Sequence, residues 1–281
     1  MLTRSNGYLT LISESVPTAS ESLQAEGYAV LEGVFTNDEV LALRTDVERV
    51  FEEFPPDDRG DDYSPGQRVP FRYEMLNRSS LVQKAVGHPR ILEAIEPLLG
   101  EDCHILANTA WWQTSGDNDH LGRFWHIDSG PHVPRDADVP WDRRIPYPVF
   151  AIATHLYLMD CPIESGPTGV IPGSHTSGQA PPIRRLADDT LGWDGRGALP
   201  IVAKAGDVAL FVSDIWHRRM PPGPNDPGRM FIQCHYGRRD IAQRLRPTSS
   251  VNHLSPEALA RATTEREATL VGIHPLSFYD G

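Results

Sequence analysis

Helical periodicity is found mainly in the N-terminal third of the chain. A capping box at Thr36 and Glu39 opens a run of apolar residues that repeat every three to four positions until Pro55. This pattern predicts one amphipathic helix, and residues 80–100 predict two shorter helices that are separated at Pro89. The predicted helices need another layer of the protein to cover their apolar faces.

The period shortens after Gly100, where apolar and alternating runs are separated by turns. Such runs predict short strands, as does an earlier run between Gly27 and Gly33. The later predicted strands cover residues 104–112, 123–128, 149–159, 169–171, 199–203, 208–212 and 230–236. These short strands favour a β-sandwich or barrel with flanking helices, a mainly β fold of the α+β type. One further helical stretch is predicted at 255–267.

Two connections between the predicted strands are long, at 129–148 and 174–198. Long loops in compact β folds are usually functional, so both are candidate lids, although plain surface decoration explains them as well. The first contains five prolines and is therefore expected to be stiff. It also carries Arg135, Arg143 and Arg144, which either meet a substrate carboxylate or pair with neighbouring aspartates.

The composition excludes several classes of protein. With 40% hydrophobic and 23% charged residues, the chain is typical of globular proteins and not of disordered or membrane-spanning ones. Its formal net charge of -12 would repel a phosphate backbone, so we do not expect nucleic acid as a partner. No stretch approaches the roughly 20 apolar residues that cross a bilayer, so we do not expect a membrane either. Three widely spaced cysteines indicate neither a disulfide framework nor a zinc site, and without a basic and apolar leader we expect a cytoplasmic location.

A candidate metal site comes from two histidines and one carboxylate. His126 and Asp128 are two residues apart in a predicted strand, so both side chains should point to one face. His217 follows the strongly apolar run at 208–212. Two imidazoles and one carboxylate form the set that holds non-haem Fe(II) and leaves positions open for other ligands. A solvated strand face for the first pair, and a strand end for His217, explain the same residues without a metal.

Arg229 adds a second kind of group to this candidate site. It lies twelve residues beyond His217, at the start of the last predicted strand. A guanidinium that faces the barrel interior can bind a carboxylate bidentately at the far end of a ligand whose other end chelates the metal. 2-Oxoglutarate is such a ligand, whereas an ordinary surface arginine is the alternative interpretation.

Five motifs, taken together with their order along the chain, resemble those of the phytanoyl-CoA dioxygenase family of Fe(II)- and 2-oxoglutarate-dependent oxygenases. The resemblance covers about residues 21–236. The motifs are EGYAVLEGVF at 26–35, FWHID at 124–128, ESGPTGVIPGSH at 164–175, AGDVALF at 205–211 and PNDPGR at 224–229. The resemblance implies a double-stranded β-helix (a jelly-roll, cupin-like core) at about 101–240. It also implies a helical part at about 21–100, a tail at 241–281 and an extension at 1–20, with 21–281 as a single oxygenase domain.

The resemblance assigns roles to individual residues. His126, Asp128 and His217 would be the iron ligands, and Arg229 would bind the distal carboxylate of 2-oxoglutarate. Asn108 and His155 lie where relatives often place side chains that contact the cosubstrate, although a tryptophan is more usual at the position of His155. Asp128 argues against halogenation, because related halogenases have a small residue there that does not coordinate the metal.

The resemblance further implies a dioxygenase that uses Fe(II), 2-oxoglutarate and O2, and releases succinate and CO2. We expect the substrate to be a small, largely apolar molecule whose C–H bond is hydroxylated or otherwise oxidised. A cupin-like metal-dependent hydrolase or isomerase, and a non-catalytic small-molecule sensor on the same barrel, are the alternative functions. No oligomeric state follows from the sequence.

Overall fold

The computed structural model describes residues 2–5, 8–11, 17–55, 69–115, 122–128, 130–142, 144–243 and 254–275. The strands are β1 (Leu2–Ser5), β2 (Tyr8–Leu11), β3 (Tyr28–Leu31), β4 (Phe71–Tyr73), β5 (His104–Gln113), β6 (Ala151–Tyr157), β7 (Thr168–Val170), β8 (Leu199–Pro200), β9 (Val208–Val212), β10 (His217–Arg219) and β11 (Arg229–Gly237). The helices are α1 (Ala19–Glu26), α2 (Asn37–Glu53), α3 (Met75–Arg78), α4 (Ser80–Val86), α5 (Pro89–Leu99), α6 (Pro256–Ala260) and α7 (Glu265–Leu270).

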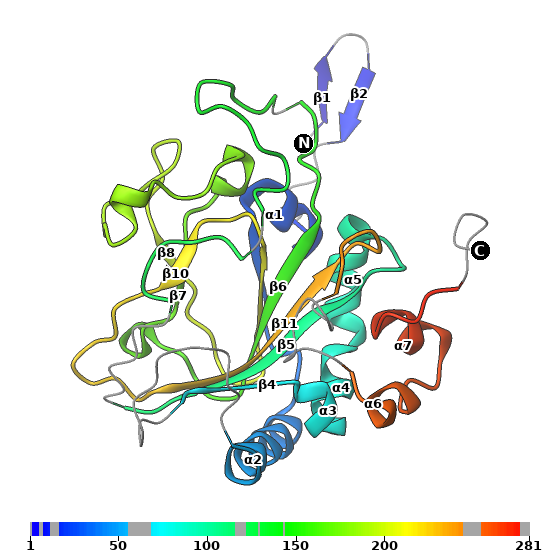
Figure 1. Cartoon of the computed structure of the whole chain (residues 1–281). Coiled ribbons are helices and arrows are strands. Elements are labelled where there is room, and N and C mark those ends of the chain that lie inside the picture. The colour runs from blue at the N-terminus through cyan, green and yellow to red at the C-terminus, as the bar shows by residue number, and fades with distance from the viewer. Residues whose placement is uncertain are drawn as a thin grey trace.

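Two antiparallel sheets form the centre of the protein (Figure 1). The larger sheet has the strand order β3-β9-β6-β11-β5-β4, and the smaller one has the order β10-β7-β8. Side chains of both sheets share one core, which includes Val170 of β7, Phe211 of β9 and Phe231 of β11. With its flanking helices, this arrangement confirms the predicted double-stranded β-helix of the α+β class.

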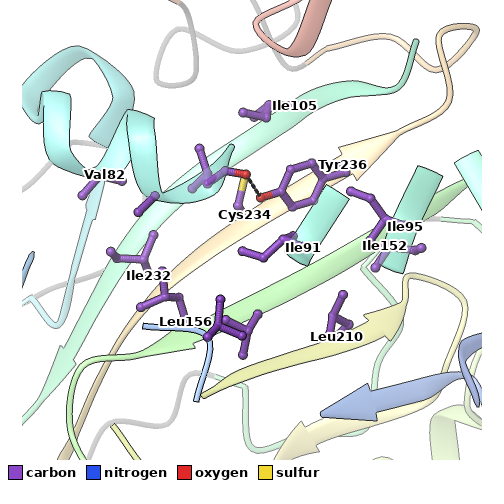
Figure 2. Packing of buried hydrophobic residues seen from close by; sticks show 14 of the residues in the cluster. Val82, Ile91, Ile95, Ile105, Ile152, Leu156, Leu210, Ile232, Cys234 and Tyr236 are labelled. Carbon is purple, nitrogen blue, oxygen red and sulfur yellow. Dashed lines mark hydrogen bonds between the residues drawn. The ribbon is translucent and has the colours of Figure 1, made fainter. Parts of the chain in front are cut away.

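Helices cover the other face of the larger sheet. Ile91 and Ile95 of α5 pack with Ile152 of β6 and Ile232 of β11 in this second core (Figure 2). Each such fully buried side chain contributes about 1.5–3 kcal/mol relative to an exposed one. The hydroxyl of Tyr236, at the end of the cluster, donates a hydrogen bond of 2.6 Å to the carbonyl oxygen of Val86. The apolar faces that the helical periodicity predicted are therefore covered by the sheet.

The predicted capping box forms in α2, and two further helices begin with boxes that were not predicted. The Thr36 hydroxyl accepts from the Glu39 amide, and α2 ends at Glu53, close to the prolines. The helix α1 was not predicted, although Thr18 and Glu21 form the same box ahead of it. A third box at Thr264 starts α7, so the predicted single helix at 255–267 is wrong and two short helices stand there instead.

Residues 123–128 do not form the predicted strand. The amide of Trp125 donates to Leu186, that of His126 to His217, and that of Asp128 to Ser213. Because successive amides bond to different segments, only His126 makes a β-bridge, with His217, and no ladder forms. The predicted strand at 199–203 is likewise shorter and ends at Pro200.

The connection at 129–148, called the lid below, has no helix or strand in its described residues. Ser129 and Arg143 lie outside those residues. Cys103, Cys161 and Cys234 are buried and form no disulfide. Within the described ranges, no helix has the length and apolar character that a membrane span requires.

Candidate active site between the two sheets

The structure brings the three predicted metal ligands together. His217 begins β10, His126 lies opposite it in the bridge, and Asp128 follows two residues later. One ligand atom from each residue lies within 4.8 Å of the other two. The Nε2 atom of His217 is 3.4 Å from Oδ1 of Asp128, and the two imidazole centres are 4.2 Å apart. Three side chains from two segments thus point at one small volume.

Backbone carbonyls orient both imidazoles. The Nδ1 atom of His126 is 2.7 Å from the carbonyl oxygen of Phe124, and Nδ1 of His217 is 3.0 Å from that of Ile215. If Nδ1 carries the proton and donates it to the carbonyl, the Nε2 lone pair of each ring is available to a metal. Such outer partners fix the tautomer and direction of a ligating histidine.

The three groups also shift one another's ionisation. Burial raises the pKa of Asp128, but the neighbouring His217 and His235 outweigh burial, and the net pKa lies below its usual range. Burial and the adjacent His217 lower the pKa of His126 to about 4, so this imidazole is neutral at pH 7. Burial lowers the pKa of His217, but the adjacent Asp128 outweighs burial and the net pKa is raised. A metal binds a carboxylate and neutral imidazoles, so metal binding at His217 displaces a proton wherever this ring is charged. The donor set of two nitrogens and one oxygen therefore fits Fe(II) and leaves its remaining positions open.

A second group of polar side chains lies deeper between the sheets. Arg229, Phe231 and Gln233 alternate along β11 and therefore face the same side as His155 on β6, which pairs with Gln233. Together with the three ligands and Thr168, they line a cavity of about 80 Å³. The site thus joins the three candidate metal ligands to a buried guanidinium.

Arg229 is buried and held in place within this cavity. The residue is only 5% exposed. The Nη1 atom donates to the carbonyl oxygen of Gly166 at 3.0 Å, and Nε donates to Oε1 of Gln113. The guanidinium carbon also lies 5.2 Å from the ring centre of Phe231. These contacts fix the direction of a positive charge whose natural ligand is a carboxylate.

His155 also lies in this cavity. It is buried, and its Nδ1 is 3.3 Å from the hydroxyl of Thr168. The Nε2 atom is buried without a hydrogen-bond partner among the described residues. Burial and the positive charge of Arg229 lower the pKa of His155 well below its usual value, so the ring is neutral. An uncharged imidazole with one unused nitrogen suits a polar ligand better than a packing role.

Asn108 does not reach the cavity, which corrects the prediction that it contacts the cosubstrate. It pairs with Cys234, whose side chain belongs to the helix-side core, so both residues face the helices. Its Oδ1 accepts a hydrogen bond of 2.9 Å from the backbone amide of Leu76. The residue therefore holds α3 against the sheet.

Replacing Asn108 with leucine is expected to destabilise the fold by about 1–3 kcal/mol, because it leaves the buried Leu76 amide without an acceptor. The affinity for 2-oxoglutarate should not change. Urea unfolding and ligand titration on the same variant check both parts. Weaker 2-oxoglutarate binding at unchanged stability would instead show that Asn108 contacts the cosubstrate, as the sequence predicted.

Other residues singled out in the sequence take mostly structural positions. Trp111, which the sequence analysis did not name, also lines the 80 Å³ cavity, where its Nε1 donates to Oε1 of Gln233 at 2.8 Å. Arg144 pairs with Asp142 at 2.6 Å at the surface, which is the predicted alternative of pairing with a neighbouring aspartate. Arg135 lies 5.1 Å from the ring centre of Trp141 and donates to the carbonyl oxygen of Val139. Arg135 and Arg144 of the lid thus have partners within the protein.

The structure adds residues that the sequence analysis did not name. Nδ1 of His235 is 3.8 Å from Oδ2 of Asp128, beside the candidate metal ligands. Gln113 and Gln233 complete the polar lining around Arg229. The period of two along β11, from Arg229 to His235, was the available signal, because it places every second residue in the interior.

Comparison with solved structures shows the same fold in several other proteins. EctD from S. alaskensis has a TM-score of 0.64 at 19% identity, with 88% of this chain and 87% of that chain covered. HygX from Streptomyces hygroscopicus, solved with nickel, 2-oxoglutarate and hygromycin B, has a TM-score of 0.58 at 18% identity, with coverage of 82% and 94%. SnoN, a non-heme alpha ketoglutarate dependent epimerase from nogalamycin biosynthesis, has a TM-score of 0.59 at 16% identity, with coverage of 85% and 94%.

The family model for phytanoyl-CoA dioxygenase (PhyH) matches residues 23–219. This segment contains the three candidate metal ligands and His155, whereas Arg229 lies ten residues beyond its end. The match spans well over half of the chain and agrees with the donor set that fits Fe(II). The chain therefore belongs to the phytanoyl-CoA dioxygenase family, and it is an Fe(II)- and 2-oxoglutarate-dependent oxygenase.

Proposed function

We propose that this protein oxidises an unactivated C–H bond of a small, largely apolar molecule, with hydroxylation as the simplest outcome. The observation that carries the proposal is the convergence of His126, Asp128 and His217 in one cavity with the buried Arg229. Iron bound there with 2-oxoglutarate couples the reduction of O2 to the decarboxylation of 2-oxoglutarate to succinate and CO2, and thereby supplies the oxidising power for the substrate.

Each residue has a defined part in this proposal. The two imidazoles and the Asp128 carboxylate hold the metal. Arg229 binds the distal carboxylate of 2-oxoglutarate and fixes the direction of that ligand. The unused Nε2 of His155 contributes a further hydrogen bond to the cosubstrate, and the surrounding Trp111 and Phe231 exclude water.

The lid supports a small organic molecule as the substrate. Val139, Trp141, Ile145 and Tyr147 of the lid, together with the charged Glu26, Arg135 and Arg196, line a cavity of about 690 Å³, a size that suits a drug-sized molecule. None of these residues lines the 80 Å³ site cavity. Proteins with the same fold bind nogalamycin RO and hygromycin B in their solved structures. The epimerase SnoN shows that one fold serves more than one reaction, so hydroxylation needs a direct test.

The direct test is an anaerobic titration of the Fe(II)-loaded protein with 2-oxoglutarate, followed by visible absorption. We expect a charge-transfer band that saturates with 2-oxoglutarate, and succinate formation once O2 is admitted. Oxygenated product is then sought by mass spectrometry with a panel of apolar metabolites. If no band forms in protein shown to contain iron, the cosubstrate assignment fails, and a metal-dependent hydrolase or a sensor becomes the better account.

A further inference from the structure

Asp214 lies in the turn between β9 and β10 and connects this turn to both ends of the lid. The residue is only 4% exposed. Its carboxylate accepts from the His132 backbone amide at 3.0 Å and contacts Nδ1 of His132 at 2.5 Å. The hydroxyl of Tyr147 donates to the same carboxylate at 3.2 Å. One buried carboxylate thus holds two lid residues that are fifteen positions apart.

The residues on either side of Asp214 bind the base of the lid and a metal ligand. The Ser213 carbonyl oxygen accepts from the Asp128 amide at 3.1 Å, and the Ser213 amide donates to Ala151 at 3.0 Å. These two bonds hold the points where the lid leaves and rejoins the barrel. The Ile215 carbonyl oxygen orients His217 through Nδ1 at 3.0 Å. Residues 213–215 therefore contact the lid and two of the candidate metal ligands, Asp128 and His217.

Aromatic packing supports the same attachment. The His132 ring stacks on Phe150, with centres 5.1 Å apart and planes 9° apart. The Tyr147 ring meets the rings of Trp141 and His175 edge-on. Burial and the charge of Asp214 raise the pKa of Tyr147, so its hydroxyl remains a donor at any ordinary pH. The contact is thus built around a carboxylate that accepts from several donors at once.

We propose that Asp214 is a positioning residue, which holds the lid closed and at the same time sets the turn that directs His217 and Asp128. This role rests on the proposed function of His126, Asp128 and His217 as metal ligands, and it adds the lid to that site. Lid closure and ligand geometry are coupled because one short turn bears both sets of bonds. A lid that opens would therefore disturb the direction of the metal ligands.

The variant that tests this is Asp214→Asn, which keeps the shape of the side chain but presents an amide NH2 to groups that donate. Asp207→Asn is a matched control, because Asp207 lies at the other end of β9 and its buried carboxylate accepts from the Gly33 and Lys204 amides. Trypsin reports on the lid through cleavage after Arg135 and Arg144. Cleavage after Arg185, outside the lid, serves as the internal reference.

We expect Asp214→Asn to accelerate cleavage at the two lid sites by roughly ten-fold or more relative to the Arg185 site, because proteolysis follows the population of locally open states. Tyr147→Phe removes one donor and should accelerate the same cleavages by about three- to ten-fold, which keeps the test valid if Asp214→Asn folds poorly. The Fe(II)–2-oxoglutarate band should still form in Asp214→Asn, with a shifted maximum, and should not move in Asp207→Asn.

Equal acceleration at all three sites, or none at the lid, would overturn the role of Asp214 in holding the lid. A band of unchanged position beside a loosened lid would overturn the coupling to the metal ligands. If the wild-type protein gave no band, the proposed function would fail. The cleavage pattern would then still decide whether Asp214 holds the lid, since it needs neither iron nor 2-oxoglutarate.

Discussion

Replacing His217 with alanine is expected to abolish 2-oxoglutarate turnover and to weaken iron binding by more than about 100-fold, because the loss of even an outer partner of a ligand costs about 10- to 100-fold. The variant leaves one imidazole and one carboxylate, too few to hold Fe(II) against water. Iron content after gel filtration and succinate formation under O2 measure the two effects.

The matched control for this prediction is His175→Ala. His175 is also a buried histidine, but its Nε2 lies 3.3 Å from the carbonyl oxygen of Gln24 and it belongs to the turn after β7. We expect this variant to lose stability while it retains iron and 2-oxoglutarate binding. Full iron content and turnover in His217→Ala would show that the clustered side chains are not the metal site.

Replacing Arg229 with alanine is expected to raise the dissociation constant for 2-oxoglutarate by roughly 100-fold, about 3 kcal/mol, with iron binding unchanged. The buried guanidinium is fixed by Gln113 and Gly166, so a bound carboxylate meets a charge that is already directed toward it. Titration of the absorption band in the Fe(II)-loaded variant measures the affinity.

Two further variants separate charge from geometry at this position. Arg229→Lys keeps the positive charge but not the planar fork, so its affinity should lie between those of the wild type and Arg229→Ala. His155→Phe keeps the ring and removes one hydrogen bond, and about a ten-fold loss is expected. An affinity in Arg229→Ala equal to that of the wild type would place the cosubstrate carboxylate elsewhere.

The sequence predicted the elements whose periodicity is strong and local. β9 spans the predicted residues, and α2 begins at the predicted capping box, because a run of apolar side chains or a pair of capping groups acts within one element. α1 has the same box but only a weak apolar pattern, and it was missed. The break between α6 and α7 was missed because the box at Thr264 lies inside an apparently continuous helical pattern.

The candidate site was predictable where its members share a recognisable motif. His126, Asp128 and His217 were named from their order in the sequence, and the structure brings them together. The prediction placed Asn108 in the cavity, but its side chain faces the helices. Which face a strand residue occupies depends on its position in the register, and a sequence motif does not specify that position. His235 faces the interior for the same reason and was not named.

The family, the order of most strands along the chain and the chemical types of the candidate ligands could therefore be read from the sequence. Only the folded protein shows which residues share the cavity and how the lid is attached. Asp214, His132 and Tyr147 carry no common motif, and the first lies more than sixty residues from the other two. Such contacts depend on the packing of distant segments, which local propensity and hydrophobic period do not encode.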